Sequence, residues 1–325
     1  MDLVIINDTA THRLPFYLAE EEFLARNYPD RDFFFMWQVE PTVIVGRHQL
    51  IDKEINIEYC RKNGIDICRR KSGGGAVVAD MNNIMFSYIT SSDDVSTTFS
   101  DYTSRVAKSL RLLGLDATDN SRNDILIGDR KVSGNSFYHI PGRSIVHGTM
   151  LYDFDIERMV NALSPSKAKL ASHGVASTKS RVTSIKACLP QLSINDFKKH
   201  ILETIIDGET LALTEDDIAK IIQIEQEYYT AEWLYGKNPK GELNVSKRIE
   251  GIGELGLSIE MNHGRIKGIT LSGDFLETAD AEKYLNTLLN DKPYDKEAIE
   301  DILTENPPAA VIPGLTIQNF INLIF

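Results

Sequence analysis

The sequence predicts a mixed α/β (α+β) fold, in which helices lie on the faces of a mixed sheet and a smaller α/β domain follows at the C-terminus. Strand and helix patterns alternate irregularly, and several strand patterns follow each other directly, which favours a mixed sheet. Near residues 236–246 the stretch GKNPKGELNV is rich in turn formers. We therefore expect two domains, at 1–245 and 246–325.

The strands of the larger domain are predicted from short runs of β-branched and aromatic residues between turn formers. A hairpin is expected where Gly128-Asp129 separates two such runs, because this dipeptide suits a two-residue turn. The predicted strands are 33–37, 42–46, 65–70, 76–80, 83–90, 125–127, 130–132 and 144–151.

Helices are predicted where apolar residues recur every three or four positions. Residues 96–113 have this pattern and Gly114 follows as a stop signal, whereas Thr214 and Asp217 form a capping box before another helix. The remaining predicted helices are 197–206, 218–228, 279–289, 295–304 and 315–324, and a hairpin is predicted at 255–261 and 265–273.

Composition excludes several classes of protein. The net charge of −12 argues against a nucleic-acid binder, which needs clustered Lys and Arg. Cys60, Cys68 and Cys188 follow no disulfide or metal spacing, which favours a reducing compartment. The chain shows neither a signal peptide nor an apolar run of about 18 residues. A cytoplasmic protein without membrane contact is expected.

The strongest chemical motif is Arg69-Arg-Lys-Ser-Gly-Gly-Gly-Ala-Val77, between two predicted strands. Consecutive glycines let backbone N–H groups approach an anion, and guanidinium groups suit phosphate or carboxylate oxygens. The motif is not a Walker A loop, since no Gly-Lys-Ser/Thr follows, and it opens no helix. On its own it is also compatible with a flexible turn.

A second motif puts a carboxylate and a lysine on the two arms of the predicted hairpin. Asp124 precedes the turn and Lys131 follows it, so the two side chains are expected to meet. Lysine there can neutralise charge on a phosphate and an acyl oxygen, and Asp124 can hold Mg²⁺. A solvated hairpin with ordinary surface charges is the alternative.

Further along, His147 and Gly148 lie on a predicted strand, where a lone histidine is more often structural than catalytic.

Taken together and in this order, these motifs resemble those of the lipoate-protein ligases. The pattern Arg-Arg-x-Ser-Gly-Gly-Gly, then Asn-Asp, Gly-Arg-Lys-x-Ser-Gly and His-Gly-Thr is similar to that family's. Two later segments, Ser180-Arg-Val-Thr183 and Glu232-Trp-Leu-Tyr-Gly236, also resemble it. The matching segments are Arg69–Gly75, Asn123-Asp124, Asp129–Gly134 and His147–Thr149.

The resemblance implies the biotin and lipoate protein ligase fold for the catalytic domain, with an accessory C-terminal domain. It implies that lipoate is activated with ATP and Mg²⁺ to lipoyl-AMP, and that the lipoyl group then passes to a lysine of a lipoyl-accepting protein. The implied acceptors are the E2 subunits of 2-oxoacid dehydrogenases and the glycine-cleavage H protein.

The resemblance also implies site residues, with Lys131 and Arg70 as the catalytic pair. Ser72 is expected to contact the carboxylate, Asn83 to order a loop and His147 to line the pocket. Asp124 is the expected magnesium ligand. The residues expected to bind ATP, the adenylate or lipoate are Arg70, Ser72, Gly73, Gly74, Gly75, Ala76, Val77, Val78, Asn83, Asp124, Lys131, His147 and Gly148.

Three positions depart from the family pattern. Val78 and Ala79 stand where an aromatic residue and a histidine are usual, and Val146 replaces a first histidine before His147. These changes put the preference between lipoate and octanoate, or the rate, in question more than the reaction class.

The sequence is also compatible with two other functions. The first is an acyltransferase of the same fold that uses a preformed acyl donor, although no cysteine follows Lys131 as a thiol nucleophile. The second is a non-catalytic lipoate sensor, which Val78 and Ala79 motivate. A biotin ligase is disfavoured because its glycine loop differs from Lys71-Ser-Gly-Gly-Gly75.

Overall fold

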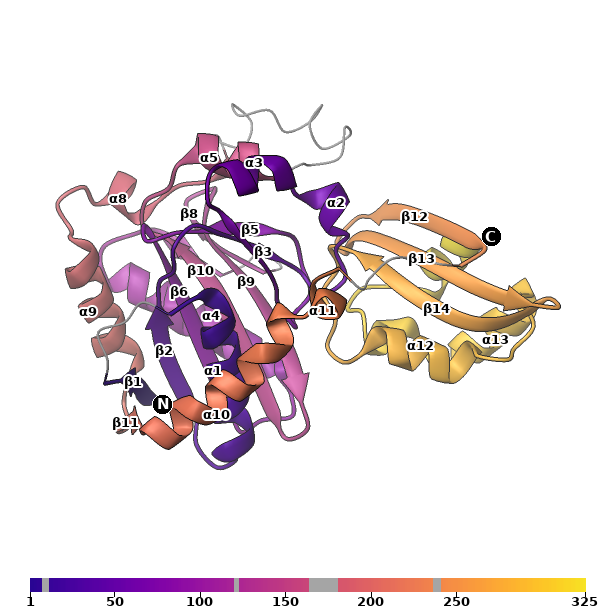
Figure 1. Cartoon of the computed structure of the whole chain (residues 1–325), viewed down its shortest axis with the longest axis horizontal. Coiled ribbons are helices and arrows are strands. Elements are labelled where there is room, and N and C mark those ends of the chain that lie inside the picture. Colours follow the sequence, from indigo (N-terminus) through magenta and orange to yellow (C-terminus); the bar gives the residue numbers. More distant parts are fainter. Residues whose placement is uncertain (8–11, 120–122, 164–180, 236–240) are drawn as a thin grey trace. The chain divides into compact units, whose positions relative to one another are not determined.

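The computed structural model describes residues 1–7, 12–119, 123–163, 181–235 and 241–325, and they fall into two compact units (Figure 1). The first unit is built from Met1–Ile44, Asp52–Cys68 and Val77–Thr230. The second contains Val45–Ile51, Arg69–Ala76 and Ala231–Phe325. The C-terminal third of the chain therefore shares a unit with two short segments from the N-terminal third.

An eight-stranded mixed sheet forms the centre of the first unit. Strand β1 pairs in parallel with β11 and with β2, and the neighbouring strands from β2 to β7 pair antiparallel. In sheet order the strands are β11 (Thr210–Leu213), β1 (Asp2–Ile6), β2 (Phe33–Trp37), β6 (Asn83–Thr90), β10 (Arg143–Leu151), β9 (Arg130–Ile140), β8 (Asp124–Ile127) and β7 (Ala117–Thr118).

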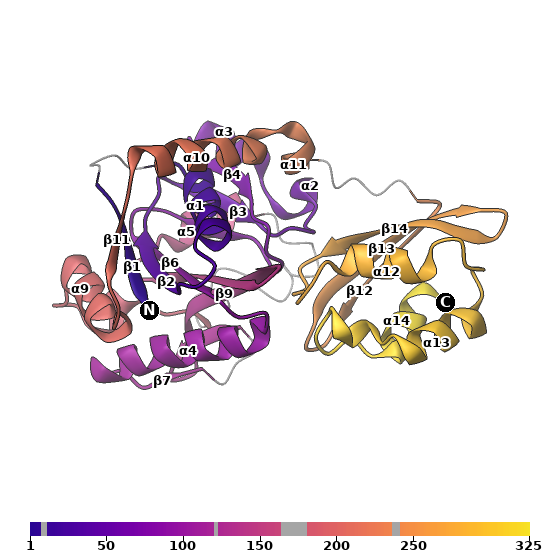
Figure 2. The same cartoon turned by 90° about the horizontal axis from the view of Figure 1, so that it is seen from below.

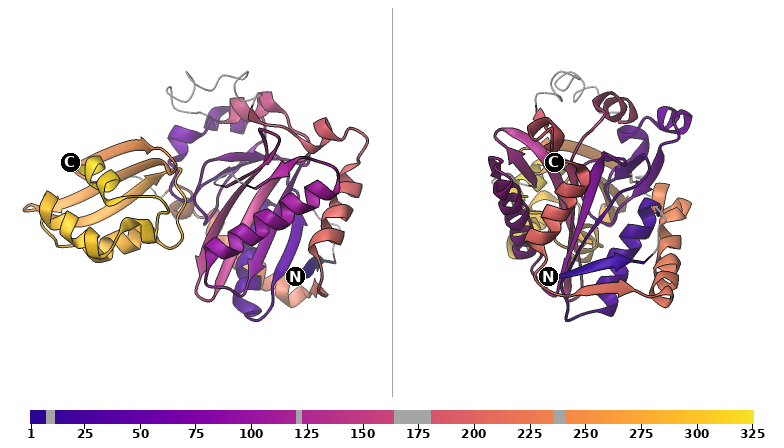
Figure 3. Two further views of the ribbon diagram at one scale, coloured as in Figure 1. Left: turned by 180° about the vertical axis from the view of Figure 1, so that it is seen from behind. Right: turned by 90° about the vertical axis from the view of Figure 1, so that its left-hand side faces the viewer.

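Helices cover both faces of this sheet, as Figure 2 shows. Helix α4 (Val95–Leu112) packs on one face, where Tyr102 lies against Tyr88 and Phe99 against Phe137. Figure 3 shows α4 in front of the sheet in its left view. Helix α1 (Leu14–Asn27) covers the opposite face and packs against α10 (Glu215–Glu225). Below, these are called the α4 face and the α1 face.

Helix α1 is buried along nearly its whole length. Every residue from Leu14 to Ala25 is buried, including the consecutive acids Glu20, Glu21 and Glu22. Burying three carboxyl groups is costly unless each finds a partner or becomes neutral. These three buried acids therefore mark α1 as a candidate functional element.

The remaining elements of the first unit surround the main sheet. Capping side chains begin several of the helices, as when Ser193 accepts from the backbone of Asp196. These elements are the small sheet β4 (Asp66–Arg69), β3 (Thr42–Val45) and β5 (Val77–Ala79), part of which belongs to the second unit, and the helices α3 (Ile57–Lys62), α5 (Ile156–Ala162), α8 (Ile185–Cys188), α9 (Ile194–Ile205) and the 3₁₀ turn η1 (Gln226–Tyr229).

The second unit is centred on an antiparallel three-stranded sheet, whose strand order is β12 (Leu243–Ile249), β13 (Gly253–Asn262) and β14 (Arg265–Gly273). Its core joins the sheet to helices through fully buried side chains such as Leu271, Phe275 and Phe320. The helical elements are α11 (Ala231–Tyr235), α12 (Ala281–Leu289), α13 (Lys296–Glu305), η2 (Pro308–Ala310) and α14 (Ile317–Ile324), whereas α2 (Ile51–Glu54) straddles the two units.

Most elements agree with the sequence predictions, and the mixed α/β fold class is confirmed. Strand β6 has the predicted bounds, and the capping box of Thr214 and Asp217 is present. Four elements, α1, β1, β11 and β12, were not predicted from the sequence. The boundary predicted between residues 245 and 246 stays a prediction; β12 already begins at Leu243. No helix of the described residues is long and apolar enough to cross a membrane.

Candidate active site

The predicted meeting of Lys131 and Asp124 is confirmed. The Nζ atom of Lys131 lies 2.7 Å from Oδ1 of Asp124, and both side chains are about one-third exposed, at 35% and 27%. The two residues lie on β9 and β8, which the Gly128-Asp129 turn joins, and Gly128 has a φ of 60°. The hairpin thus presents a paired cation and anion that remain partly accessible to solvent.

A β-bulge determines the direction of the Lys131 side chain. Ile125 pairs with Ser133 but Leu126 pairs with Lys131, so Val132 is an extra residue on β9. Such a bulge turns the neighbouring side chain to the other face of the strand. Lys131 then lies beside Gly134, where an added Cβ would be 2.6 Å from its Nζ. A Cβ at position 134 would therefore displace the flexible end of this lysine side chain.

Val182 and Thr183, which follow the undescribed residues 164–180, contact the backbone of Lys131. Val182 forms an isolated bridge with Lys131, and the backbone N–H of Thr183 donates to the Lys131 carbonyl at 2.8 Å. Both belong to the Ser180–Thr183 motif, of which Ser180 lies outside the described residues. The later motif is thus a structural partner of the lysine hairpin.

Strand register puts further candidate residues on the α1 face. Asp124 pairs with Gly134, and Gly134 pairs with Thr149, so these three positions share a face. His147 lies two residues before Thr149 on β10 and points to the same face. The α1 face therefore carries both Asp124 and His147, and the bulge adds Lys131.

His147 is held by the buried helix α1. Its Nδ1 lies 3.1 and 3.0 Å from Oε1 and Oε2 of Glu21, and the same Oε1 accepts from Ser87 Oγ at 2.6 Å. Ser87 also accepts from Trp37 Nε1 at 2.9 Å, and the Trp37 ring stacks on Tyr17 with centroids 4.8 Å apart. These five residues, called the Glu21 network below, tie α1 to β2, β6 and β10.

Two other predicted site residues, Gly148 and Asn83, lie among contacts that support the fold. Gly148 points to the α4 face, where an added Cβ would meet Asn135 Oδ1 at 1.9 Å and Tyr102 Oη at 2.6 Å. Asn83 is buried and donates from Nδ2 to Asp80 Oδ1 at 3.2 Å, which orders the turn before β6. Val146 is buried and alternates with His147, so this departure from the family pattern also lies on the α4 face.

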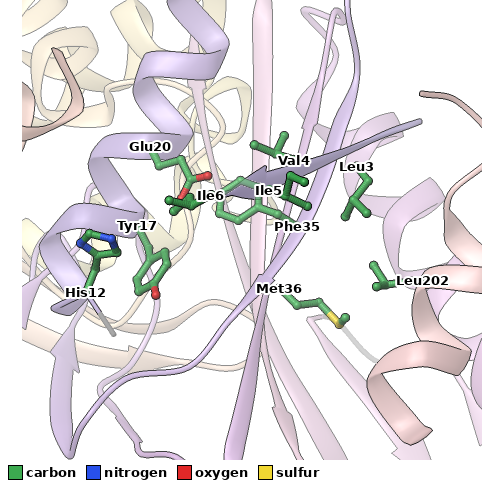
Figure 4. Close-up of a pocket in the computed structure, with 10 residues that line it drawn as sticks. All are labelled: Leu3, Val4, Ile5, Ile6, His12, Tyr17, Glu20, Phe35, Met36 and Leu202. Atoms are coloured by element: carbon green, nitrogen blue, oxygen red, sulfur yellow. The ribbon is translucent and has the colours of Figure 1, made fainter. Parts of the chain in front are cut away.

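A pocket of about 310 Å³ opens beside α1 (Figure 4). Apolar side chains line it together with the polar residues His12, Tyr17 and Glu20, and Glu20, which is 1% exposed, reaches into it. Burial and the neighbouring Glu21 charge raise the pKa of Glu20 well above its ordinary value. The lining residues are Leu3, Val4, Ile5, Ile6, His12, Tyr17, Glu20, Phe35, Met36 and Leu202.

The glycine motif lies in the second unit and is shaped by Arg70. This guanidinium donates from Nε to Ser72 Oγ at 3.0 Å and from Nη2 to the carbonyls of Gly73 and Gly75 at 2.6 and 2.9 Å. Arg70 and Ser72 are both buried. These contacts fold the loop around the arginine.

Arg69 is a structural residue. Its Nη1 donates to the carbonyls of Gly46, Arg47 and Gln49, and its Nε and Nη2 donate to the Leu234 carbonyl. With 2% of its surface exposed, Arg69 is surrounded by backbone acceptors. The suggestion that both arginines suit phosphate oxygens is therefore wrong for Arg69.

The segment that precedes α12 packs directly on the glycines. Gly74, at φ 86°, donates its N–H to the Phe275 carbonyl at 2.9 Å. A Cβ on Gly73 would lie 2.6 Å from that carbonyl oxygen, a contact that backbone atoms cannot relieve easily. After these first two glycines, the third, Gly75, is exposed and Ala76 is half-buried.

A buried histidine and glutamate reinforce this contact. His48 Nε2 lies 2.8 Å from Glu277 Oε1, and the His48 ring stacks on Phe275 with centroids 4.9 Å apart. The other oxygen of Glu277 accepts the backbone N–H of Ala281 at 3.0 Å. The segment 44–49, which contains His48, can be recognised in the sequence as a candidate pocket wall, but its pairing with Glu277 was missed because the two residues are 229 positions apart.

The predicted residues are thus distributed over both units. Val77 and Val78 begin β5, where they pair with Ile44 and Val43. Among the described residues, no group of three or more His, Cys, Asp or Glu side chains is arranged to hold a metal ion. Asp124 remains a single carboxylate of the kind that Mg²⁺ uses together with phosphate oxygens.

Family models match most of the chain. Residues 14–206 match the model described as the lipoyl protein ligase A/B catalytic domain. Residues 238–324 match the model described as the bacterial lipoate protein ligase C-terminus.

Curated relatives are similar over nearly their full length. The lipoate-protein ligase LplJ of Bacillus subtilis is 35% identical, and the match covers 95% of this chain and 96% of that protein. Lipoate-protein ligase 1 of Staphylococcus aureus is 36% identical, with 89% of each chain covered.

Solved structures share the fold. LipL1 of P. falciparum, in complex with lipoate, aligns with a TM-score of 0.79 at 22% identity and covers 99% of this chain and 97% of its own. A bipartite lipoate protein ligase from Thermoplasma acidophilum, studied with its E2 lipoyl domain, has a TM-score of 0.65 at 28% identity and covers 74% and 98%. A lipoate-protein ligase A bound with ATP has a TM-score of 0.60 at 28% identity and covers 73% and 99%.

Proposed function

The chain belongs to the lipoate-protein ligases, and from that premise we propose that it activates lipoate with ATP before it transfers the lipoyl group to a protein lysine. In the first step a lipoate carboxylate oxygen attacks the α-phosphorus of ATP. The bond to the β-phosphate oxygen breaks, and pyrophosphate leaves. In the second step the neutral lysine amine of the acceptor attacks the acyl carbonyl, AMP leaves, and the amine proton is lost to form the amide.

The Lys131–Asp124 pair is the observation that carries this proposal. Both steps build negative charge, first around the α-phosphate and then on the acyl oxygen. A positioned ammonium group stabilises such charge more strongly in the transition state than in the ground state. Lys131 is held at 2.7 Å from Asp124 and remains 35% exposed, so it is available to a substrate.

The glycine loop has a different proposed task. Its backbone N–H groups at Gly75 and Ala76, with those of Val77 and Val78, bind phosphate and adenylate, as consecutive N–H groups commonly do. Arg70 keeps the loop in shape through its contacts with Ser72, Gly73 and Gly75. The 28% identical ligase that binds ATP supports the nucleotide assignment.

Mg²⁺ is proposed to accompany ATP, with Asp124 as its protein ligand. Mg²⁺ is often bound by one or two carboxylates together with substrate phosphates, so a single aspartate fits this arrangement. When bound, the ion neutralises phosphate charge. Lys131 Nζ lies 2.7 Å from Asp124 Oδ1 and so orients this carboxylate.

The acyl chain of lipoate is proposed to lie on the α1 face. His147 is on that face, and the pocket beside α1, which apolar and polar residues line together, has a volume at the lower end of the range of ligand sites. Residues 1–245 are proposed as the catalytic domain and 246–325 as the accessory domain.

The acceptor is proposed to be a lipoyl domain. The Thermoplasma ligase studied with its E2 lipoyl domain supports this class, and the E2 subunits of 2-oxoacid dehydrogenases and the glycine-cleavage H protein are the expected partners.

Pyrophosphate release in the absence of an acceptor tests the activation step. We expect release from ATP that depends on lipoate, and its loss in Lys131→Ala. A folded parent that releases no pyrophosphate, but transfers an acyl group from a preformed donor, would identify an acyltransferase. Lipoate binding without either reaction would identify a sensor.

A further inference from the structure

The side chain of Asn135 lies at the centre of a buried polar cluster on the α4 face. Its Oδ1 atom accepts from Tyr102 Oη and from Ser133 Oγ, each at 3.0 Å, and its Nδ2 atom donates to the Asn123 carbonyl at 3.1 Å. Asn135 is 4% exposed, and Tyr102 and Ser133 are fully buried. A buried carboxamide is stable when its donors and acceptors have partners, and this one is bonded at both ends.

Asn123 and Asn135 are joined by three hydrogen bonds. Besides the side-chain bond, the Asn123 carbonyl accepts the backbone N–H of Asn135 at 2.9 Å, and Asn123 Nδ2 donates to the Asn135 carbonyl at 3.2 Å. Asn123 directly precedes Asp124, the first residue of β8. The backbone that carries Asp124 is therefore held in place by Asn135.

This cluster and the proposed catalytic pair lie on opposite faces of the same strands. Successive side chains of a strand alternate between faces, so Asn135 points to the α4 face, whereas Gly134 and its partner Asp124 are on the α1 face. There Asp124 Oδ1 lies 2.7 Å from Lys131 Nζ. Asn135 therefore acts on this pair through the backbone and not by direct contact.

The glycine of the His-Gly-Thr motif leaves the space that the carboxamide needs. Gly148 pairs with Asn135, and a Cβ on Gly148 would lie 1.9 Å from Oδ1 and 3.0 Å from Cγ of that residue. Any larger residue at position 148 would therefore displace the carboxamide from its partners. The motifs that contain Asn123, Lys131 and Gly148 thus meet at one side chain.

Helix α4 supplies the second anchor of the cluster. Burial raises the pKa of the Tyr102 hydroxyl well above its ordinary value, so this group stays a neutral donor to Asn135. The Tyr102 ring packs against Tyr88, with ring centroids 5.6 Å apart, which limits its movement. The carboxamide is thus held between a fixed hydroxyl on α4 and the chain that enters β8.

We propose that Asn135 is a positioning residue for Asp124, which it holds, through the Asn123 backbone, where the carboxylate meets both Lys131 and the magnesium ion of Mg·ATP. This inference rests on the proposed function, because it takes Asp124 as the Mg²⁺ ligand. Asn135 itself takes no part in the bond changes. Its loss weakens the part of ATP binding that depends on Mg²⁺ and slows adenylate formation, whereas metal-free ATP binding is unchanged.

Two variants and one control in the full chain test this inference. Asn135→Ala removes the bonds to Tyr102 and to the Asn123 carbonyl, whereas Tyr102→Phe removes a single hydroxyl and keeps the ring. Thr98→Val is the matched control, because the buried Thr98 hydroxyl also joins α4 to the sheet, but does so at 2.8 Å from Thr90 Oγ1 on β6. Thermal unfolding shows whether each variant is folded at the assay temperature.

Three readouts separate positioning from a structural role. Hydrogen exchange of the ligand-free protein reports the protection of β8, and calorimetric titration gives the affinity for ATP with Mg²⁺ and with EDTA. Pyrophosphate release at saturating lipoate gives kcat and the KM for Mg·ATP.

The largest change is expected in Asn135→Ala. We expect faster exchange in β8, about tenfold weaker Mg·ATP binding with unchanged metal-free binding, and a kcat lower by about 10²-fold, the scale of a group misplaced by about 1 Å. Tyr102→Phe should lose about fivefold in kcat, the scale of one neutral hydrogen bond. Thr98→Val should match the parent in all three readouts.

Several results would overturn the proposal. They are a folded Asn135→Ala variant with parental kcat and Mg·ATP affinity, whatever its unfolding temperature, and a parent that binds ATP equally well with Mg²⁺ and with EDTA. If Asn135→Ala does not fold, equal values for Tyr102→Phe and Thr98→Val overturn it as well. If the parent binds Mg·ATP but releases no pyrophosphate, the activation step fails, while exchange and the magnesium-dependent part of binding still decide the role of Asn135.

Discussion

The loop around Arg70 and the hairpin around Lys131 hold their charged groups in opposite ways. Arg70 is 6% exposed and donates to three acceptors within its own loop. Lys131 is 35% exposed and has Asp124 at 2.7 Å. The contacts of Arg70 therefore fix the shape of the loop, whereas the hairpin presents a charge that remains partly exposed to solvent. Two motifs that look equally cationic in the sequence have different physical roles.

Removal of the Lys131 charge gives the largest expected effect. In Lys131→Ala we expect pyrophosphate release to fall by about 10²–10³-fold, the scale of losing one electrostatic contact to a transition state. Stability should change by less than about 1 kcal/mol, because the ion pair is partly exposed. Arg130→Ala is the matched control, since that exposed residue is next to Lys131 in the turn. Equal losses in both variants would contradict a specific role.

The anchor of the loop is tested next, at Glu277. In Glu277→Ala, His48 Nε2 and the N–H of Ala281 lose their buried acceptor. We expect about 3 kcal/mol of destabilisation, as is usual when one partner of a buried pair is removed. Glu277→Gln should lose less stability than Glu277→Ala. Glu297→Ala, at an exposed position of α13, should lose little stability. An unchanged unfolding midpoint in Glu277→Ala would mean that the pair does not hold the loop.

Gly73 and Gly75, on either side of Gly74, differ in the space around them. A Cβ on Gly73 would meet the Phe275 carbonyl oxygen at 2.6 Å, whereas one on Gly75 would meet nothing within 4 Å. We expect Gly73→Ala to be destabilised by about 1–3 kcal/mol, the usual range for overpacking. Gly75→Ala should keep the parental unfolding midpoint. The same midpoint for both variants would show that the loop adapts freely to added volume.

The smallest effect is expected at Asp280, which caps α12 and pairs with Arg47 at 2.9 Å. Asp280→Asn keeps a capping side chain but removes the charge, so we expect a loss of less than about 1 kcal/mol at neutral pH. Burial raises the pKa of Asp280, but the Lys283 N–H and Arg47 outweigh it, so the folded pKa lies below the ordinary aspartate value of 3.8.

Because the folded pKa is lowered, this contribution to stability is present above the unfolded pKa, near 4, and is lost as pH falls through the folded pKa. Unfolding midpoints of the parent and Asp280→Asn should therefore converge below about pH 4. A difference between them that is larger at pH 3 than at pH 7 would contradict the assigned sign.

The sequence predicted those parts of the fold that have a regular hydrophobic pattern. Helix α4 could be predicted because one of its faces is apolar and the other is not. Helix α1 was missed because it is buried on nearly all sides, and its Glu20-Glu21-Glu22 run resembles an exposed surface. Strands β1 and β11 are short and pair over about two hundred residues of separation, which no local pattern reveals.

The candidate site was predictable where motifs report local geometry. The turn at Gly128-Asp129 implied that Lys131 and Asp124 meet, but nothing in the sequence indicated the bulge at Val132 that turns the lysine to the α1 face. The arginine pair was interpreted as two anion ligands, and the structure surrounds Arg69 with backbone carbonyls. Glu21 lies 126 residues from His147, so their contact had no signal in a single sequence.

Lys131 is proposed to serve both half-reactions, and the transfer step shows whether it acts in the second. Lipoyl-adenylate is supplied to the parent and to Lys131→Ala, and the rate of lipoyl transfer to a lipoyl domain is measured without ATP. We expect the transfer rate to fall in the variant, as pyrophosphate release does. Transfer at the parental rate would contradict it and would confine Lys131 to the activation of lipoate.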